Sequence, residues 1–118
     1  MARLDCGARG FACSSGMAAI TGIMFLFRPG DHIIVTEDIY GGTRRLFDRL
    51  LADYDLEFSY VDTSHINEIK AAIRPSTKGI FVETLTNPLL KFADIATIAS
   101  ICRENKILFI ADNTFLTL

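Results

Sequence analysis

Asp112 is the residue of this 118-residue chain that points most directly to chemistry. It ends an unbroken apolar run at positions 107–111, and Asn113 and Thr114 follow it. Such a run predicts a buried parallel strand, and the carboxyl ends of parallel strands open onto the ligand crevice of an α/β sheet. A bare carboxylate is costly to bury, so this one should face a cation, a strong donor or water. We therefore expect Asp112 to be directed at a ligand.

A second polar segment, Ser-Ser-Gly-Met at residues 14–17, opens an apolar stretch. A glycine at a helix start lets a ligand come close to the backbone. The free amides there, with about half a positive charge from the helix dipole, suit a phosphate. An ordinary helix cap explains the same residues, so this segment alone does not identify a ligand.

Two further polar loops each follow a predicted strand. Residues 40–43, Tyr-Gly-Gly-Thr, place an aromatic ring ahead of two glycines, and such a ring can stack on a flat ligand without steric obstruction. A partly buried tyrosine at a turn is the alternative. Residues 83–88, Glu-Thr-Leu-Thr-Asn-Pro, offer Asn87 as a donor to an oxygen, and Pro88 restricts its backbone to an extended conformation. The loops together suit an anionic, flat ligand.

Composition and missing motifs argue against several other classes of protein. The net charge is -2, and the adjacent pair Arg44 and Arg45 is too small a basic patch to favour a nucleic-acid partner. The three cysteines lack CxxC spacing, so we expect neither a disulfide framework nor a metal site. Cys13 and Cys102 lie in apolar stretches and should be core side chains. A dinucleotide fingerprint, a P-loop and a Gly-x-Ser-x-Gly elbow are absent from the sequence.

The segments that must position these residues alternate between helix and strand. The patterns predict strands at 32–36, 57–61, 79–83 and 107–111, and helices at 17–27, after 40–43 to about 52, at 65–73 and at 94–104. Strands that are apolar on both faces and separated by helices indicate an α/β fold, a mainly parallel sheet with helices on both faces.

The uncharged stretch at residues 10–27 could also be considered as a membrane span. Its first half is rich in turn-forming residues, and only residues 17–27 are uniformly apolar, which is too short to cross a bilayer. A helix that is apolar on every side should lie in a core or at a subunit interface. We therefore expect a buried helix and no membrane partner.

Four motifs, in this order, resemble one enzyme family. They are Ser-Gly-Met-Ala-Ala-Ile at 15–20, Asp-Ile-Tyr-Gly-Gly-Thr at 38–43, Glu-Thr-Leu-Thr-Asn-Pro at 83–88 and Ala-Asp-Asn-Thr-Phe at 111–115. The family is the transsulfuration group of pyridoxal 5'-phosphate (PLP) enzymes in cysteine and methionine metabolism. It includes cystathionine γ-synthase, the cystathionine β- and γ-lyases, methionine γ-lyase and the homoserine-ester sulfhydrylases. The resemblance covers the whole chain and implies part of the large PLP-binding domain of a fold-type I, aminotransferase-like enzyme.

The resemblance also implies how the chain would hold PLP. The backbone amides of Gly16 and Met17 would bind the cofactor phosphate, and Tyr40 would stack on the pyridine ring. Asn87 would donate to the phenolic oxygen of the ring, and Asp112 would pair with the pyridine nitrogen. An adjacent opposite charge favours the charged form of such a nitrogen by roughly 1 to 3 pKa units. The ring then drains electrons from the reacting carbon of the substrate.

Catalytic roles follow from the same resemblance. Asp112 and Tyr40 would be catalytic, with Tyr40 also taking part in proton handling, and Thr114 would be a secondary contact beside the ring. Glu83 would support the residues that touch the cofactor, or would pack, rather than react. The reaction would be elimination or replacement at the β or γ carbon of a sulfur amino acid, namely cystathionine, homocysteine or methionine, or of an O-acylhomoserine. The sequence does not choose among these.

Parts of the family pattern are missing from the chain. The Schiff-base lysine of the family lies in a Ser-x-x-Lys segment, and none of the four lysines, Lys70, Lys78, Lys91 and Lys106, has that context; each is expected to be a solvated surface residue. We therefore expect residues 1–118 to be a partial PLP-binding domain, truncated at both ends and inactive alone, from a cytoplasmic, homotetrameric parent. Leu85 replaces a proline that is usual in its loop. A non-catalytic ligand-binding remnant and another fold-type I enzyme remain alternatives.

Overall fold

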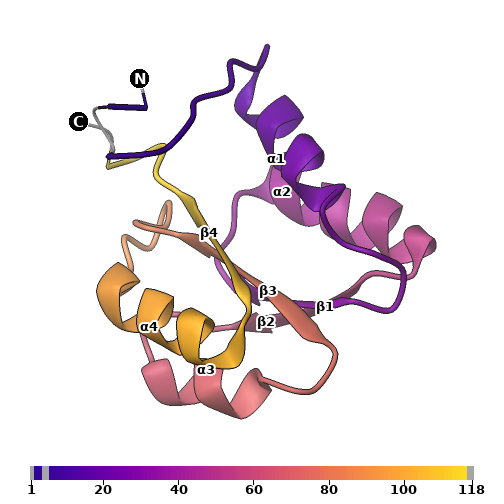
Figure 1. The fold of residues 1–118 in the computed structure, drawn as a ribbon, viewed down its shortest axis with the longest axis vertical. Helices are drawn as coiled ribbons and strands as arrows, with labels where there is room; N and C mark the ends of the chain where they lie inside the picture. Colours follow the sequence, from indigo (N-terminus) through magenta and orange to yellow (C-terminus); the bar gives the residue numbers. More distant parts are fainter. Residues whose placement is uncertain (1, 4–5, 117–118) are drawn as a thin grey trace.

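The computed structural model, which describes residues 2–3 and 6–116, has helices packed on both faces of a four-stranded sheet (Figure 1). The strand order is β2-β1-β3-β4, and every neighbouring pair is parallel. The strands are β1 (His32–Thr36), β2 (Glu57–Val61), β3 (Thr77–Glu83) and β4 (Leu108–Asp112). The predicted α/β fold with a parallel sheet is confirmed.

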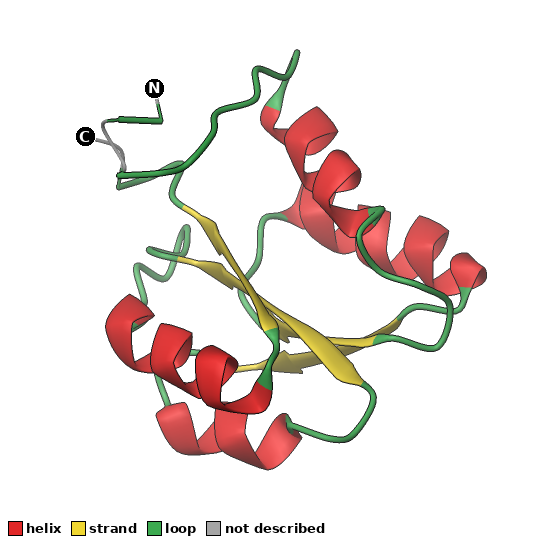
Figure 2. Ribbon diagram, in the orientation of Figure 1, coloured by secondary structure: helices red, strands yellow, loops and turns green. Residues whose placement is uncertain are grey.

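Two pairs of helices cover the sheet. Figure 2 shows the pair α1 and α2 on one face, and the pair α3 and α4 on the other. The helices are α1 (Gly16–Met24), α2 (Gly41–Leu46), α3 (Ile66–Ala72) and α4 (Ile95–Asn105). Helix α2 continues as a π-helical turn, η1 (Phe47–Leu51), and a 3₁₀ turn, η2 (Ala52–Tyr54).

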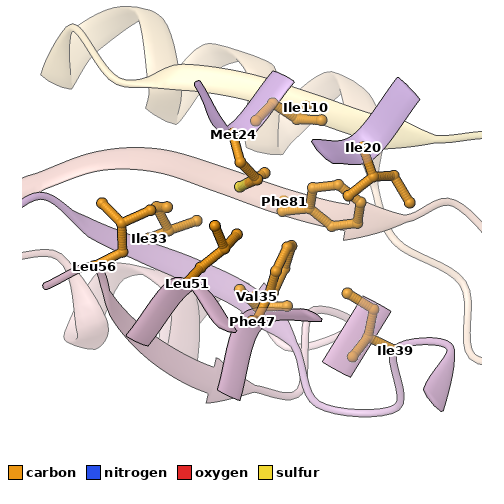
Figure 3. Packing of buried hydrophobic residues seen from close by; sticks show 10 residues of the cluster. All are labelled: Ile20, Met24, Ile33, Val35, Ile39, Phe47, Leu51, Leu56, Phe81 and Ile110. Atoms are coloured by element: carbon orange, nitrogen blue, oxygen red, sulfur yellow. The ribbon is translucent and has the colours of Figure 1, made fainter. Parts of the chain in front are cut away.

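Each face of the sheet has its own hydrophobic core because side chains alternate along a strand. On β1, Ile33 and Val35 pack into the core beneath α1 and α2, whereas Ile34 packs into the core beneath α3 and α4. Figure 3 shows the first core, in which Phe47 approaches the edge of Phe81 with ring centroids 5.6 Å apart. These cores fix the strands whose carboxyl ends carry the polar loops.

The predicted helix starts are confirmed at the two helices that have side-chain caps. The Ser15 hydroxyl accepts the Ala18 amide at 3.1 Å, and the Asp94 carboxylate accepts the Thr97 amide at 3.1 Å. Such caps satisfy amides that the helix itself leaves free.

Some predicted burial is wrong. Helix α1 ends at Met24 rather than at position 27, and Phe25 beyond it is 82% exposed, so only part of the apolar segment lies in a core. Cys13 is exposed because it lies in the extended segment before α1. In the helix expected to end at about position 52, Leu50 is exposed although it is apolar, whereas Phe47 and Leu51 of the same π-helical turn are buried.

Among the described residues, none of the helices has the length and apolarity needed to cross a bilayer. The longest, α4, has 11 residues.

Candidate functional site

The order of the strands creates a topological switch point between β1 and β3. From β1 the chain passes to β2 on one side, then crosses to β3 on the other side of β1. In open parallel sheets, ligands bind beyond the carboxyl ends of the strands at such a point. The loops after β1 and β3 are those that carry Tyr40 and Asn87.

A cavity of about 370 Å³ lies at this edge of the sheet. Its volume is within the range of roughly 300 to 1,000 Å³ usual for small-molecule sites. Its walls come from the start of α1, the loop after β1, the loop after β3 and the segment after β4. The lining residues are Ser15, Gly16, Met17, Ile20, Tyr40, Glu83, Leu85, Asn87, Asp112, Thr114 and Phe115. All six residues expected from the sequence to form the site are among them.

The start of α1 supplies donors for an anion. The Ser15 cap takes up the Ala18 amide, while the amides of Gly16 and Met17 have no hydrogen-bond partner among the described residues. A methyl group at Gly16 would meet nothing within 4 Å, so the backbone is open to an approaching group. Free amides at the positive end of a helix dipole bind phosphate.

The backbone of Tyr40, rather than its ring, makes the hydrogen bond that holds this residue at the cavity. Its amide donates to the Glu83 carboxylate at 2.7 Å, while the residue is 61% exposed. Gly42 makes room for the ring, since a β-carbon there would come within 3.2 Å of several ring atoms. At Gly41 a β-carbon would meet nothing within 4 Å. The second glycine of the pair is therefore the one that the ring position requires.

Glu83 holds the Tyr40 amide, which is a supporting contact of the kind that the sequence led us to expect of it. It ends β3, is buried, and lies opposite Asp112 in the register of β3 and β4. Burial raises the pKa of its carboxyl, the Tyr40 amide opposes that shift, and the nearby Asp112 and Asp38 carboxylates add to it. The signal that could have identified it is the one used for Asp112, an acid at the end of an apolar strand.

The Asp112 carboxylate is held on one side by Thr114, two positions further along the chain. One carboxylate oxygen accepts the Thr114 amide at 3.0 Å, and the Thr114 hydroxyl donates to the same oxygen. The other carboxylate oxygen accepts no hydrogen bond from the described residues, which leaves it available to a ligand. Thr114 lines the cavity and also orients this acid.

The loop after β3 folds back on itself and carries Asn87 near its tip. Leu85 and Phe92 form an antiparallel bridge, and the Thr86 amide donates to the Lys91 carbonyl at 3.0 Å. The Asn87–Pro88 peptide is cis. Leu85, which stands where the family usually has proline, lines the cavity beside Asn87.

The expectation of solvated surface lysines is wrong for Lys91. Its ammonium lies 2.7 Å from Glu37, 2.8 Å from Asp62 and 3.3 Å from Asp38. No local pattern in the sequence indicates this cluster, because its members come from three segments that only the fold brings together. None of the four lysines lines the cavity.

The donor set of the cavity fits PLP. The free amides of Gly16 and Met17 suit its phosphate, the exposed Tyr40 ring suits its flat pyridine, and the Asn87 amide suits a ring oxygen. The unpaired oxygen of Asp112 suits a protonated ring nitrogen, because an opposite charge stabilises the charged form. The phosphate, the ring face, the phenolic oxygen and the ring nitrogen of the cofactor each have a counterpart of matching chemistry on the cavity wall, whereas its aldehyde has no lysine among the lining residues.

Comparisons with known proteins agree with this chemistry. The family model for Cys/Met metabolism PLP-dependent enzymes matches residues 1–118. A cystathionine γ-lyase of Bacillus subtilis (strain 168) is 50% identical over 97% of this chain. A cystathionine γ-synthase/O-acetylhomoserine (thiol)-lyase of the same organism is 53% identical over 99% of it.

A solved structure shows that the likeness extends to the fold. The crystal structure of cystathionine γ-lyase from Lactobacillus plantarum complexed with L-serine matches 98% of the chain with a TM-score of 0.97 and 49% identity. The chain spans about 30% of the length of these relatives. This chain belongs to the family of PLP-dependent enzymes of cysteine and methionine metabolism.

Proposed function

We propose that residues 1–118 are part of the PLP-binding domain of a longer transsulfuration enzyme, called the parent enzyme below. The reaction is elimination or replacement at the β or γ carbon of cystathionine, homocysteine or methionine, or an O-acylhomoserine. The observation that carries the proposal is the convergence of Gly16, Met17, Tyr40, Asn87 and Asp112 on one cavity from four separate segments. The names of the relatives support the same class of sulfur amino acid substrate.

Each residue has a distinct task in this proposal. The Gly16 and Met17 amides bind the phosphate, and Tyr40 covers one face of the ring. Asn87 donates to the phenolic oxygen, while Asp112, oriented by Thr114, holds a proton at the ring nitrogen. When bound, PLP supplies a protonated ring that withdraws electrons from the substrate carbon next to the amino group.

The 118-residue chain by itself is proposed to be inactive. Covalent attachment of PLP requires a lysine at the ring, and the four lysines of the chain all lie outside the cavity. The parent enzyme is proposed to be a cytoplasmic homotetramer. Mass photometry of the purified parent enzyme would measure its assembly; a monomer or a dimer would contradict this part.

The test of the activity uses the parent enzyme and the chain side by side. Each is incubated with PLP and with cystathionine or an O-acylhomoserine plus a thiol. Keto acid and released thiol are quantified with cystathionine, and the thioether product and released carboxylic acid are quantified with the O-acylhomoserine. The parent enzyme should turn over at least one of these substrates, whereas the chain should turn over none. Absence of turnover by a PLP-loaded parent enzyme would favour a non-catalytic binding remnant. Turnover by the chain would refute the assignment of inactivity.

A further inference from the structure

Lys91 lies outside the cavity, yet its ammonium joins three segments at the carboxyl edge of the sheet. Glu37 and Asp38 directly follow β1, Asp62 directly follows β2, and Lys91 belongs to the loop after β3. Its distances to these carboxylates are 2.7, 3.3 and 2.8 Å respectively. One cation therefore links the two loops that carry Tyr40 and Asn87.

The path from the cluster to the cavity is short on both sides. Asp38 is two residues before Tyr40, and Lys91 is four residues after Asn87. The arm that carries Lys91 is itself tied back, because the Lys91 amide donates to the Thr86 hydroxyl at 3.1 Å. A displacement of Lys91 is thus transmitted through Thr86 to Asn87, the next residue of the same loop.

The environment of the cluster makes this link stronger than an ordinary surface ion pair. The side chains of Asp62 and Asp38 are only 14% and 18% exposed, and that of Lys91 is 31% exposed. Isolated exposed pairs contribute little, whereas networks around partly covered groups contribute more. Without the ammonium, three negatively charged carboxylates would be left facing one another. The attraction between Lys91 and these groups would then be replaced by repulsion among the carboxylates.

We propose that Lys91 is a positioning residue that sets the separation of Tyr40 and Asn87 and so preforms the cavity for the PLP ring. This inference rests on the proposed function of the cavity. Lys91 acts through Glu37 and Asp38 on one side and through its own loop on the other, without touching the cofactor. Its partners hold the pKa of the ammonium above its ordinary value, so the tie persists at neutral pH.

The test compares Lys91→Met, Lys91→Arg and Lys70→Met in the parent enzyme. Lys91→Met keeps the length of the side chain and removes its charge. Lys91→Arg keeps the charge and can still bridge carboxylates. Lys70→Met is the matched control, since Lys70 is exposed on α3 and has no ion pair among the described residues.

Two readouts are measured, and the first needs no cofactor. In cofactor-free protein, hydrogen exchange of residues 84–93 should be about tenfold faster in Lys91→Met, the factor expected when a local structure loses one charged tie. In a titration with PLP, Kd should rise about tenfold for Lys91→Met and by less than about threefold for Lys91→Arg. Lys70→Met should match the wild type in both readouts.

The outcomes separate this inference from the proposed function. A wild-type protein that does not bind PLP would refute the function, while the exchange data would still test the tie. Unchanged exchange in Lys91→Met, or faster exchange with an unchanged Kd, would overturn the positioning role. If Lys91→Met does not fold, the double variant Glu37→Gln and Asp38→Asn removes the charges of both partners on the Tyr40 side. It should weaken PLP binding in the same direction, and an unchanged Kd there would also overturn the positioning role.

Discussion

The pair of glycines after Tyr40 offers a matched test of how the ring is placed. Both glycines lie in the first turn of α2, but only at Gly42 would a β-carbon collide with the Tyr40 ring. We predict that Gly42→Ala weakens PLP binding by the parent enzyme and that Gly41→Ala does not. The comparison isolates the ring, because the chemical change is the same at two adjacent positions.

The structure decides the expected magnitude. Replacing a helical glycine by alanine stabilises by about 0.5 to 1 kcal/mol, and this gain is expected at Gly41. Overpacking would cost about 1 to 3 kcal/mol at Gly42 if the ring were fixed. Tyr40 is 61% exposed, however, so its ring can move away and relieve the clash. The cost then appears as lost stacking on PLP, about 0.5 to 1.5 kcal/mol or roughly two- to thirteenfold in Kd.

The assay measures PLP affinity by titration and thermal unfolding of the cofactor-free protein. The two alanine variants should unfold within a few degrees of each other, and Gly42→Ala alone should have the raised Kd. In a Tyr40→Ala background, the difference between the glycine variants should vanish, as in any double-mutant cycle that removes one partner. Equal affinities of the two variants, or a difference that survives without the Tyr40 ring, would refute the reasoning.

Four other predictions follow from the site and the cores. Asp112→Asn in the parent enzyme should lower turnover by at least about tenfold with a smaller loss of PLP affinity, because the ring nitrogen loses its charged partner; near-normal turnover would contradict this. Phe47→Ala should lower the free energy of unfolding by about 3 to 5 kcal/mol in urea titrations, since the ring is fully buried and stacked 4.7 Å from another ring. Burial raises the pKa of Cys102 to about 11, so iodoacetamide at pH 8 should label exposed Cys13 well before Cys102 in the folded protein; equal labelling would show that the core is open. Burial, with a contribution from the Arg74 guanidinium, lowers the pKa of His32 in the folded protein. As the pH falls, the unfolded state therefore takes up a proton on this histidine first, and the free energy of unfolding should decrease below about pH 6.5. Measurements of unfolding at several pH values should show that His32→Gln lacks this decrease.

The sequence predicted the four strands closely because each is a short run rich in aliphatic or aromatic residues between turn residues. Strands β1 and β3 are also buried on both faces, which leaves little choice of structure, whereas β2 and β4 are partly exposed. Asp112 and Glu83 show how far this reasoning reaches. An acid at the end of such a run can be located without coordinates, but the hydrogen bond from Tyr40 to Glu83 joins residues 43 positions apart. Only the strand order makes them neighbours.

The helices were predicted less well where local geometry departs from a regular turn. In the π-helical turn after α2, Phe47 and Leu51 are buried and Leu50 is exposed, and no pattern of apolar residues distinguishes such a turn in advance. Lys91 was missed for a different reason. Its three partners are spread over 26 positions of the chain, from 37 to 62, so the cluster depends on tertiary packing alone.

Strand β4 is at one end of the strand order, and on its outer side it pairs with no strand of the described residues. Its amides and carbonyls on that side form a template on which a further strand can be added. A parallel strand there would lie about 4.8 Å from β4 and would end beside Asp112. The sheet can thus be extended without altering the existing walls of the cavity, and a residue that follows such a strand would enter the site directly next to its acid.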